Sequence, residues 1–148
     1  MGIEIEHKYL VKDCSFKQLT FKSYDITQGY LSRERGRTVR VRLRDQQAFI
    51  TIKSSRVGMT RKEFEYEIPF DDGKQLIEMC PAPVLYKTRY LVEFEGKTWE
   101  IDEFHGDFDG LITAEIELES ENQQYEIPPF VGENVSNDRR YNNSQLGK

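Results

Sequence analysis

The chain has 148 residues, which suits a single domain over residues 1–148 with a sizeable core. Charged residues make up 32% and hydrophobic residues 37%, and the net charge of -5 argues against a general nucleic-acid-binding protein. No apolar run approaches the length of a transmembrane helix and no secretory signal is visible, so we expect a cytoplasmic protein with no membrane partner.

The predicted elements are almost all strands. In chain order, alternating charged and apolar residues predict strands at 2–12, 26–33, 37–45, 48–55, 62–70, 86–95, 97–104 and 111–119. Turn residues at 45–47 and 95–97 join consecutive strands into hairpins, which indicates a mainly antiparallel sheet. Short helices are predicted near 15–19, at 74–79 before two prolines, and as a turn in the tail that begins at Ser136 or Asn137.

The charges on these strands form rows of one sign. Residues i and i+2 of a strand share a face, so each row points its charges one way and its apolar residues the other. Acidic rows contain Glu4 and Glu6, then Glu63, Glu65 and Glu67, then Glu115, Glu117 and Glu119; basic rows contain Arg40, Arg42 and Arg44, then Lys87 and Arg89. Rows of both signs around one space suit a polyanion that binds together with a metal ion.

Two architectures fit this pattern. A stacked sandwich leaves the charged faces in water, whereas a closed barrel with the charged faces inward makes a polar tunnel. We favour the barrel, because solvent-facing surfaces usually mix the two signs. It turns apolar residues outward that need cover from helices, the tail or a second subunit, so we also expect a homodimer; these residues are Phe64, Tyr66, Tyr90, Phe94, Ile101 and Ile116.

The carboxylate pairs suit a hard divalent cation. Glu4 and Glu6, one pleat apart, can both reach one Mg²⁺ or Mn²⁺, and Glu115 and Glu117 form a second such pair. Lys8 shares a face with the first pair and can touch a metal-bound phosphate. The cations suited to phosphate oxygens are Arg40, Arg42, Lys53, Lys87 and Arg89.

An ordered set of motifs is similar to one known family. The segment 4–8, Glu-Ile-Glu-His-Lys, resembles the Glu-x-Glu-x-Lys signature of the CYTH superfamily, the triphosphate tunnel metalloenzymes. Further matches fall in the family's order at 28–31, 40–42, 53, 61–69, 87–89, 99–102 and 114–118, and 138–144 resembles the tail of short bacterial members. The resemblance implies an eight-stranded antiparallel closed β-barrel with a charged interior and a few short peripheral helices.

The resemblance also implies an activity. Members hydrolyse a triphosphate with Mg²⁺ or Mn²⁺, and short bacterial members are mostly associated with inorganic tripolyphosphate, so we expect a metal-dependent triphosphatase that releases phosphate from that substrate. On this reading the metal ligands come from Glu4, Glu6, Asp102, Glu115 and Glu117. The substrate is held by Arg40, Arg42, Lys53, Arg61, Lys87 and Arg89, and the catalytic groups are Lys8, Glu63, Glu65 and Glu115.

Two alternatives remain open at this point. A class IV adenylyl cyclase uses the same tunnel to make cyclic AMP from ATP, but it needs an adenine pocket, and the sequence shows no adenine-binding insert. A non-catalytic module that binds nucleotides or polyphosphate is the other. The carboxylate pairs argue against it, because phosphate binding alone favours cations over so many acids.

Overall fold

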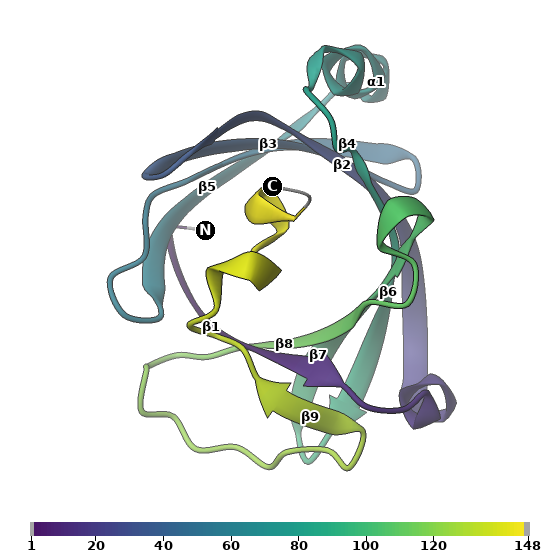
Figure 1. The fold of residues 1–148 in the computed structure, drawn as a ribbon, viewed down its shortest axis with the longest axis vertical. Coiled ribbons are helices and arrows are strands. Elements are labelled where there is room, and N and C mark those ends of the chain that lie inside the picture. Colours follow the sequence, from purple (N-terminus) through teal and green to yellow (C-terminus); the bar gives the residue numbers. More distant parts are fainter. Residues whose placement is uncertain (1, 147–148) are drawn as a thin grey trace.

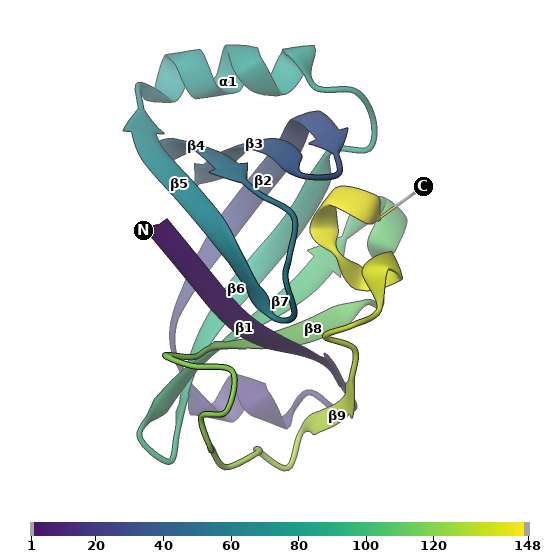
Figure 2. The same cartoon turned by 90° about the vertical axis from the view of Figure 1, so that its left-hand side faces the viewer.

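The computed structural model describes residues 2–146, and its main feature is a closed antiparallel β-barrel (Figures 1 and 2). Within these residues the barrel has eight strands: β1 Gly2–Val11, β2 Thr20–Glu34, β3 Arg37–Arg44, β4 Gln47–Lys53, β5 Thr60–Ile68, β6 Leu85–Phe94, β7 Lys97–His105 and β8 Ile112–Glu117. The order is β5-β4-β3-β2-β6-β7-β8-β1, and pairing of β1 with β5 closes the ring. The expected eight-stranded barrel is confirmed, and the sandwich is excluded.

A ninth strand, β9 (Val131–Asn134), lies outside the ring and was not predicted. One edge of β1 pairs with β5 along residues 2–5 and with β9 at Tyr9 and Val11, while its other edge pairs with β8. β9 is only four residues long and two of them are exposed, so it carries no alternating pattern. Strand β2 also begins earlier than predicted, at Thr20, because its first residues pair with β6 although most of their side chains face solvent.

The helices are few and peripheral. Helix α1 (Phe70–Met79) crosses the outer face of the barrel over β3 and β4 (Figure 2). A Cβ atom on Gly73 would lie 2.5 Å from the Cβ of Ala48, so glycine is what allows this close approach to β4. The predicted helix at 15–19 is the 3₁₀-helix Ser15–Leu19, and α1 starts earlier than the predicted residue 74.

The tail forms two 3₁₀ turns, Arg139–Tyr141 and Asn143–Gln145. The N-cap of the first turn is Asp138, whose side chain accepts a hydrogen bond from the Arg140 N–H, so the predicted start at Ser136 or Asn137 is wrong. Ser136 is instead used elsewhere, since its Oγ accepts a hydrogen bond from the Lys8 N–H of β1. In Figure 1 the two turns lie in the middle of the ring, at one mouth of the barrel.

The main hydrophobic core lies outside the barrel wall, because the inner face carries the charges. Outward residues such as Trp99, Ile101 and Ile116 are fully buried beneath Phe16 and Phe130, which come from the first 3₁₀-helix and from the segment before β9. The rings of Phe16 and Phe130 meet edge to face at 5.9 Å between centroids. The chain therefore covers most of the apolar residues that we expected to turn outward.

Cover is incomplete on the opposite side of the ring. Tyr90 and Phe94 are half-buried against the main core, but Phe64 and Tyr66 on β5 are 42% and 53% exposed. Ile52 on β4, directly opposite Phe64, is also 42% exposed.

No helix within residues 2–146 is both long enough and apolar enough to span a bilayer.

Candidate active site

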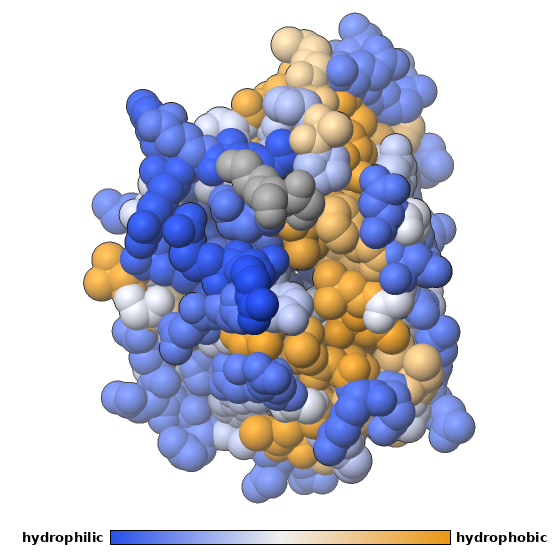
Figure 3. Space-filling view, viewed as in Figure 1, coloured by the Kyte–Doolittle hydropathy of each residue, from blue (hydrophilic) through white to orange (hydrophobic). Residues whose placement is uncertain are grey.

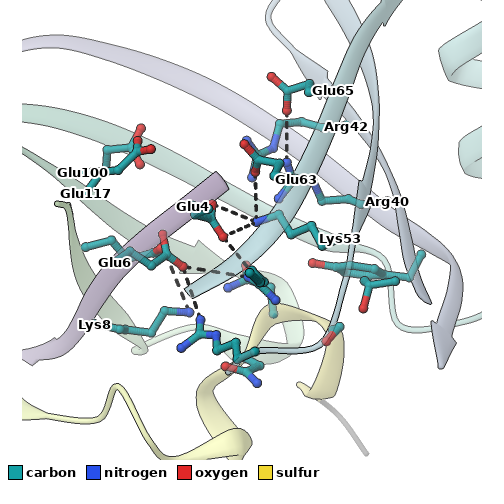
Figure 4. A pocket seen from close by; sticks show the side chains of 18 of the residues that line it. Glu4, Glu6, Lys8, Arg40, Arg42, Lys53, Glu63, Glu65, Glu100 and Glu117 are labelled. Atoms are coloured by element: carbon teal, nitrogen blue, oxygen red, sulfur yellow. Dashed lines mark hydrogen bonds and ion pairs between the residues drawn. The ribbon is translucent and has the colours of Figure 1, made fainter. Parts of the chain in front are cut away.

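A cavity of about 220 Å³ lies inside the barrel. All of the predicted site residues except Asp102 line it, and they come from β1, β3, β4, β5, β6 and β8 (Figure 4). Alternation along each strand turns the charged rows toward this space, as expected for the barrel. The lining also includes residues that the sequence-based prediction did not assign to the site: Tyr30, Thr38, Arg44, Arg56, Glu100, Asn142, Asn143 and Ser144.

Glu4 is held by two cations. Lys53 Nζ lies 3.2 Å from each of its carboxylate oxygens, and Arg61 Nε donates to Oε1 at 2.9 Å. Burial alone would raise the pKa of Glu4, but these two positive charges outweigh burial and lower the pKa to about 2. The Glu4 carboxylate is therefore ionised across the physiological range.

Glu6 and Glu115 form a buried carboxyl pair. The register of β1 against β8 places Glu6 opposite Glu117 and Lys8 opposite Glu115, which brings Glu6 and Glu115 together diagonally. Burial and the nearby charges of Glu115 and Glu4 raise the pKa of Glu6 well above its usual value. Burial also disfavours charge on Glu115, but Lys8 and the hydrogen bond from Glu6 hold its pKa well below the usual range. Protonation of this pair is therefore favoured on Glu6, whose Oε1 also accepts a hydrogen bond from Arg56 Nη2 at 3.3 Å.

Glu63 and Glu117 also belong to the carboxylate side of the cavity. Burial, with the nearby charge of Glu4, raises the pKa of Glu63, whose Oε2 lies 3.3 Å from Lys53 Nζ. Burial also raises the pKa of Glu117, followed by the charges of Glu4 and Glu100. Figure 4 shows Glu100 and Glu117 near one another at one side of the cavity.

This donor set fits a divalent cation. Hard carboxylate oxygens from neighbouring strands converge, and the close acid pairs need a positive charge or a proton between them. Within residues 2–146, no three acidic, histidine or cysteine side chains already form a metal cage. In the described part of the chain these carboxylates are instead paired with cations, since Lys53 and Arg61 bind Glu4 and Arg56 binds Glu6.

The arginines of β3 face the cavity with spare positive charge. Arg42 donates from Nε and Nη2 to the neutral amide oxygen of Gln28 at 3.0 and 2.9 Å. Burial, together with the charges of Arg40 and Arg89, lowers the pKa of Arg42 to about 9. Arg40 donates to Thr51 and to Glu65, and its Nε is buried without an acceptor in the described part of the chain. These guanidinium groups are suited to receive an anion.

Asp102 forms ion pairs with two cationic side chains of the site, Lys87 and Arg89. It is 1% exposed, does not line the cavity, and accepts hydrogen bonds from Lys87 Nζ at 2.7 Å and from Arg89 Nε and Nη2 at 2.8 and 3.0 Å. Burial of Lys87, partly offset by Asp102 and reinforced by repulsion from Arg89, lowers the pKa of Lys87 to about 7. The geometry thus gives Asp102 the position of a group that orients cations.

The tail closes one end of the cavity. Lys8 Nζ donates to the Tyr141 carbonyl at 2.9 Å, and Asn143 Oδ1 accepts from Lys87 Nζ at 2.9 Å. Beside these contacts, Leu146 packs in a small apolar cluster with Leu85 and Phe104. The segment 138–144 was matched as a motif, but nothing in its composition indicates that it reaches into the barrel.

Comparisons with known proteins agree with this geometry. The model of the family described as "CYTH domain" matches residues 2–146. The chain is 42% identical over 149 residues to the protein named "Inorganic triphosphatase" from Acetivibrio thermocellus, covering 100% of this chain and 95% of that protein. It is 34% identical to the protein of the same name from Nitrosomonas europaea, covering 97% and 95%. The crystal structure of the inorganic triphosphatase NE1496 superposes with a TM-score of 0.71, at 32% identity and 97% and 96% coverage.

Proposed function

The chain belongs to the CYTH domain family, and on that premise we propose that it is a divalent-metal-dependent triphosphatase that hydrolyses inorganic tripolyphosphate. One observation carries the proposal. One cavity joins carboxylates suited to a metal ion with arginines and lysines suited to phosphate oxygens. In the reaction water attacks the terminal phosphorus and the anhydride P–O bond breaks, which gives orthophosphate and pyrophosphate.

The cationic side of the cavity binds and orients the substrate. Arg40 and Arg42, one pleat apart on β3, present guanidinium groups that can each grip two phosphate oxygens. Lys87 and Arg89 approach from β6, and Asp102 on β7 fixes the positions of their side chains. Because these groups are held before the substrate arrives, they stabilise developing negative charge with little reorganisation.

The carboxylate side would hold the metal ion. Glu4, Glu6 and Glu117 are the proposed ligands, and Glu115 is placed to join them. A Mg²⁺ or Mn²⁺ ion held there would supply positive charge to the phosphate oxygens and would help to orient the substrate for in-line attack. Glu6 must lose its proton for this role, and Lys53 must turn from Glu4 toward a phosphate oxygen.

Proton transfer and charge neutralisation fall to the remaining groups. Glu63 has a pKa raised by burial and by Glu4, which suits a base that accepts a proton from the attacking water. Glu65, next on the same face of β5, is placed to orient that water. Lys8 lies 3.7 Å from Glu115 and is placed to neutralise the leaving oxygen. Arg61, bound to Glu4 at 2.9 Å, holds that carboxylate and can also contact substrate.

A substrate panel tests the proposal. Tripolyphosphate, ATP, GTP and thiamine triphosphate are incubated with Mg²⁺ or Mn²⁺, and orthophosphate and cyclic AMP are both measured. We expect orthophosphate release with the highest kcat/KM for tripolyphosphate, because the tunnel is lined mainly by charged side chains that suit a bare polyanion. Cyclic AMP formation would instead identify a cyclase, and binding without turnover of any substrate would identify a non-catalytic module.

We also propose that two copies associate through the uncovered strip formed by Ile52, Phe64 and Tyr66. We further propose that the protein works in the cytoplasm, without a nucleic-acid or membrane partner. Light scattering coupled to size-exclusion chromatography tests the association. The wild-type protein should elute as a dimer and the Phe64→Glu variant as a monomer. A wild-type protein that is monomeric at every concentration would refute it.

A further inference from the structure

A second cavity of about 240 Å³ lies beside the first. Its walls come from the β2–β3 turn, the loop between β4 and β5, and the two turns of the tail. Five arginines line it, and all of its other lining residues within 2–146 are neutral; the arginines are Arg33, Arg35, Arg56, Arg61 and Arg139. No carboxylate belongs to this lining, in contrast to the tunnel, although Arg56 and Arg61 pair with Glu6 and Glu4 on the tunnel side.

The surface around this cavity differs from the rest of the same face. In Figure 3, hydrophilic residues gather on the left of the mouth and apolar residues on the right. Figure 1 shows the β2–β3 turn and the β4–β5 loop on that left side. A concentration of arginines is unexpected in a chain with a net charge of -5, because like charges packed together repel. An anion that binds among them would relieve that repulsion.

Several of these arginines have unused hydrogen-bonding capacity. Within residues 2–146, the side chains of Arg35 and Arg139 form no hydrogen bond or ion pair. Arg33 donates only to the backbone carbonyls of Pro81, Ala82 and Pro83, and its Nε is buried without an acceptor. The site therefore offers guanidinium donors that no carboxylate of the chain occupies.

The second cavity adjoins the tunnel through shared side chains. Arg56 and Arg61 line both, and they hold Glu6 and Glu4 at 3.3 and 2.9 Å on the tunnel side. Thr38, Asn142 and Ser144 also line both. An anion that leaves the carboxylate-rich tunnel at this side meets a region where only positive and neutral groups face it.

We propose that the arginine-lined cavity is a second anion site that binds inorganic pyrophosphate or orthophosphate without a metal ion. The absence of acidic side chains from its described lining gives a metal ion no carboxylate ligand and gives a metal-free anion nothing to repel it. The identity of these anions as products of the tunnel rests on the proposed triphosphatase function. The site then holds a released product close to the tunnel mouth and makes that product an inhibitor of turnover.

Calorimetric titration of pyrophosphate and of orthophosphate in EDTA tests the site without reference to activity. The wild-type protein should bind pyrophosphate at one site per chain, more tightly than orthophosphate, with affinity that falls as salt rises. The Arg35→Ala/Arg139→Ala variant should bind at least about tenfold more weakly, which corresponds to about 1.4 kcal/mol. Neither side chain has a hydrogen-bonding or ion-pair partner within the described chain, so the fold should persist. Circular dichroism checks that it does.

A matched control removes the same charge from the same two segments. In the Arg37→Ala/Arg140→Ala variant, the lost side chains pair with Glu34 and Asp138 and do not line the cavity. This control should bind pyrophosphate within about twofold of wild type. Equal binding by the Arg35→Ala/Arg139→Ala variant and wild type, or an equal loss in the Arg37→Ala/Arg140→Ala control, would overturn the second site.

A kinetic measurement separates the site from the proposed function. If tripolyphosphate is hydrolysed, the Arg35→Ala/Arg139→Ala variant should keep the initial rate but need at least about tenfold more pyrophosphate for half-inhibition. If no triphosphate is hydrolysed while metal-free binding still depends on Arg35 and Arg139, the anion site stands and its origin as a product site is refuted. Unchanged inhibition by pyrophosphate in an active variant would also refute the product role.

Discussion

Lys53 Nζ lies 3.2 Å from both carboxylate oxygens of Glu4, so a proposed phosphate-binding cation and a proposed metal ligand form an ion pair with each other. The ion pair satisfies two buried charges that would otherwise be costly to desolvate. When a metal–triphosphate complex enters, both partners can exchange this contact for one with the ligand. The resting site thus keeps its charges compensated and is still arranged for its ligand.

The Glu4→Gln variant should lose kcat/KM for tripolyphosphate by about 10²-fold or more, because it keeps the shape of the side chain but removes the charge that a cation needs. Phosphate release at saturating Mg²⁺ and Mn²⁺ measures the effect. Glu67→Gln is the matched control, since Glu67 belongs to an acidic row of β5 but does not line the cavity. Near wild-type rates for Glu4→Gln would remove this residue from the metal site.

The Arg40→Ala substitution should lower kcat/KM for every triphosphate to a similar degree, because the guanidinium would contact the phosphates and not the base. We expect kcat/KM for tripolyphosphate and for ATP to fall at least about tenfold each, with their ratio changed by less than about threefold. Arg37→Ala, which alters an exposed arginine on the same strand, serves as the control. A selective loss of ATP turnover would show that Arg40 reads the nucleoside.

Lys87 should titrate near neutral pH in the ligand-free protein. Its pKa is lowered to about 7, so the side chain is charged below that pH and neutral above it, and its hold on phosphate weakens as the pH rises. An unfolded lysine titrates near its ordinary value, so between these two pKa values the unfolded state binds more protons and this residue's contribution to stability rises with pH.

Lysine-labelled NMR spectra test this titration. One lysine resonance should have a midpoint near 7 and should be missing from the spectrum of Lys87→Met. Addition of tripolyphosphate with Mg²⁺ should move that midpoint upward, because negative charge favours the ammonium form. A Lys87 resonance that stays charged above pH 9 without ligand would contradict the proposed desolvation.

Phe130→Ala should lower the free energy of unfolding by about 3–5 kcal/mol, although the residue lies far from the tunnel lining. Its ring is 1% exposed and fills the core between the barrel wall and the outer segments. Phe64→Ala removes the same atoms from a side chain that is 42% exposed and should cost about 1 kcal/mol or less in the monomer. Urea denaturation compares the two, and similar losses would place the core elsewhere.

The inner face of the barrel was predictable where a strand alternates charged and apolar residues and its charges have one sign, as on β3 and β5. Arg40 and Arg42 face the cavity for that reason, and Glu100 could have been found in the same way, since it shares a face with Asp102 on β7. Alternation alone cannot say which inward acid reaches the cavity and which is covered. The register of β6 against β7 sets Arg89 directly opposite Asp102, and that pairing covers the carboxylate.

Other features leave no periodic signal. Arg56 lies in the loop between β4 and β5, where no alternation shows that its side chain turns toward Glu6. The cover of the outer core was also missed in part, because β9 and the segment before it are short and irregular. Because this cover was not foreseen, a second subunit was expected to cover residues such as Ile101 and Ile116, which the chain itself buries.

The pairing of β1 also constrains how the chain is made. Among the strands within residues 2–146, β1 is synthesised before all the others, yet β8 and β9, which pair with it, are synthesised after all the rest. Until then this strand exposes unpaired backbone groups along an edge that could recruit another nascent chain. Closure that joins distant parts of a sequence is slow. A chain that stalls before β8 should therefore aggregate through β1, and chaperone contact should concentrate on β1 until β8 and β9 have been synthesised.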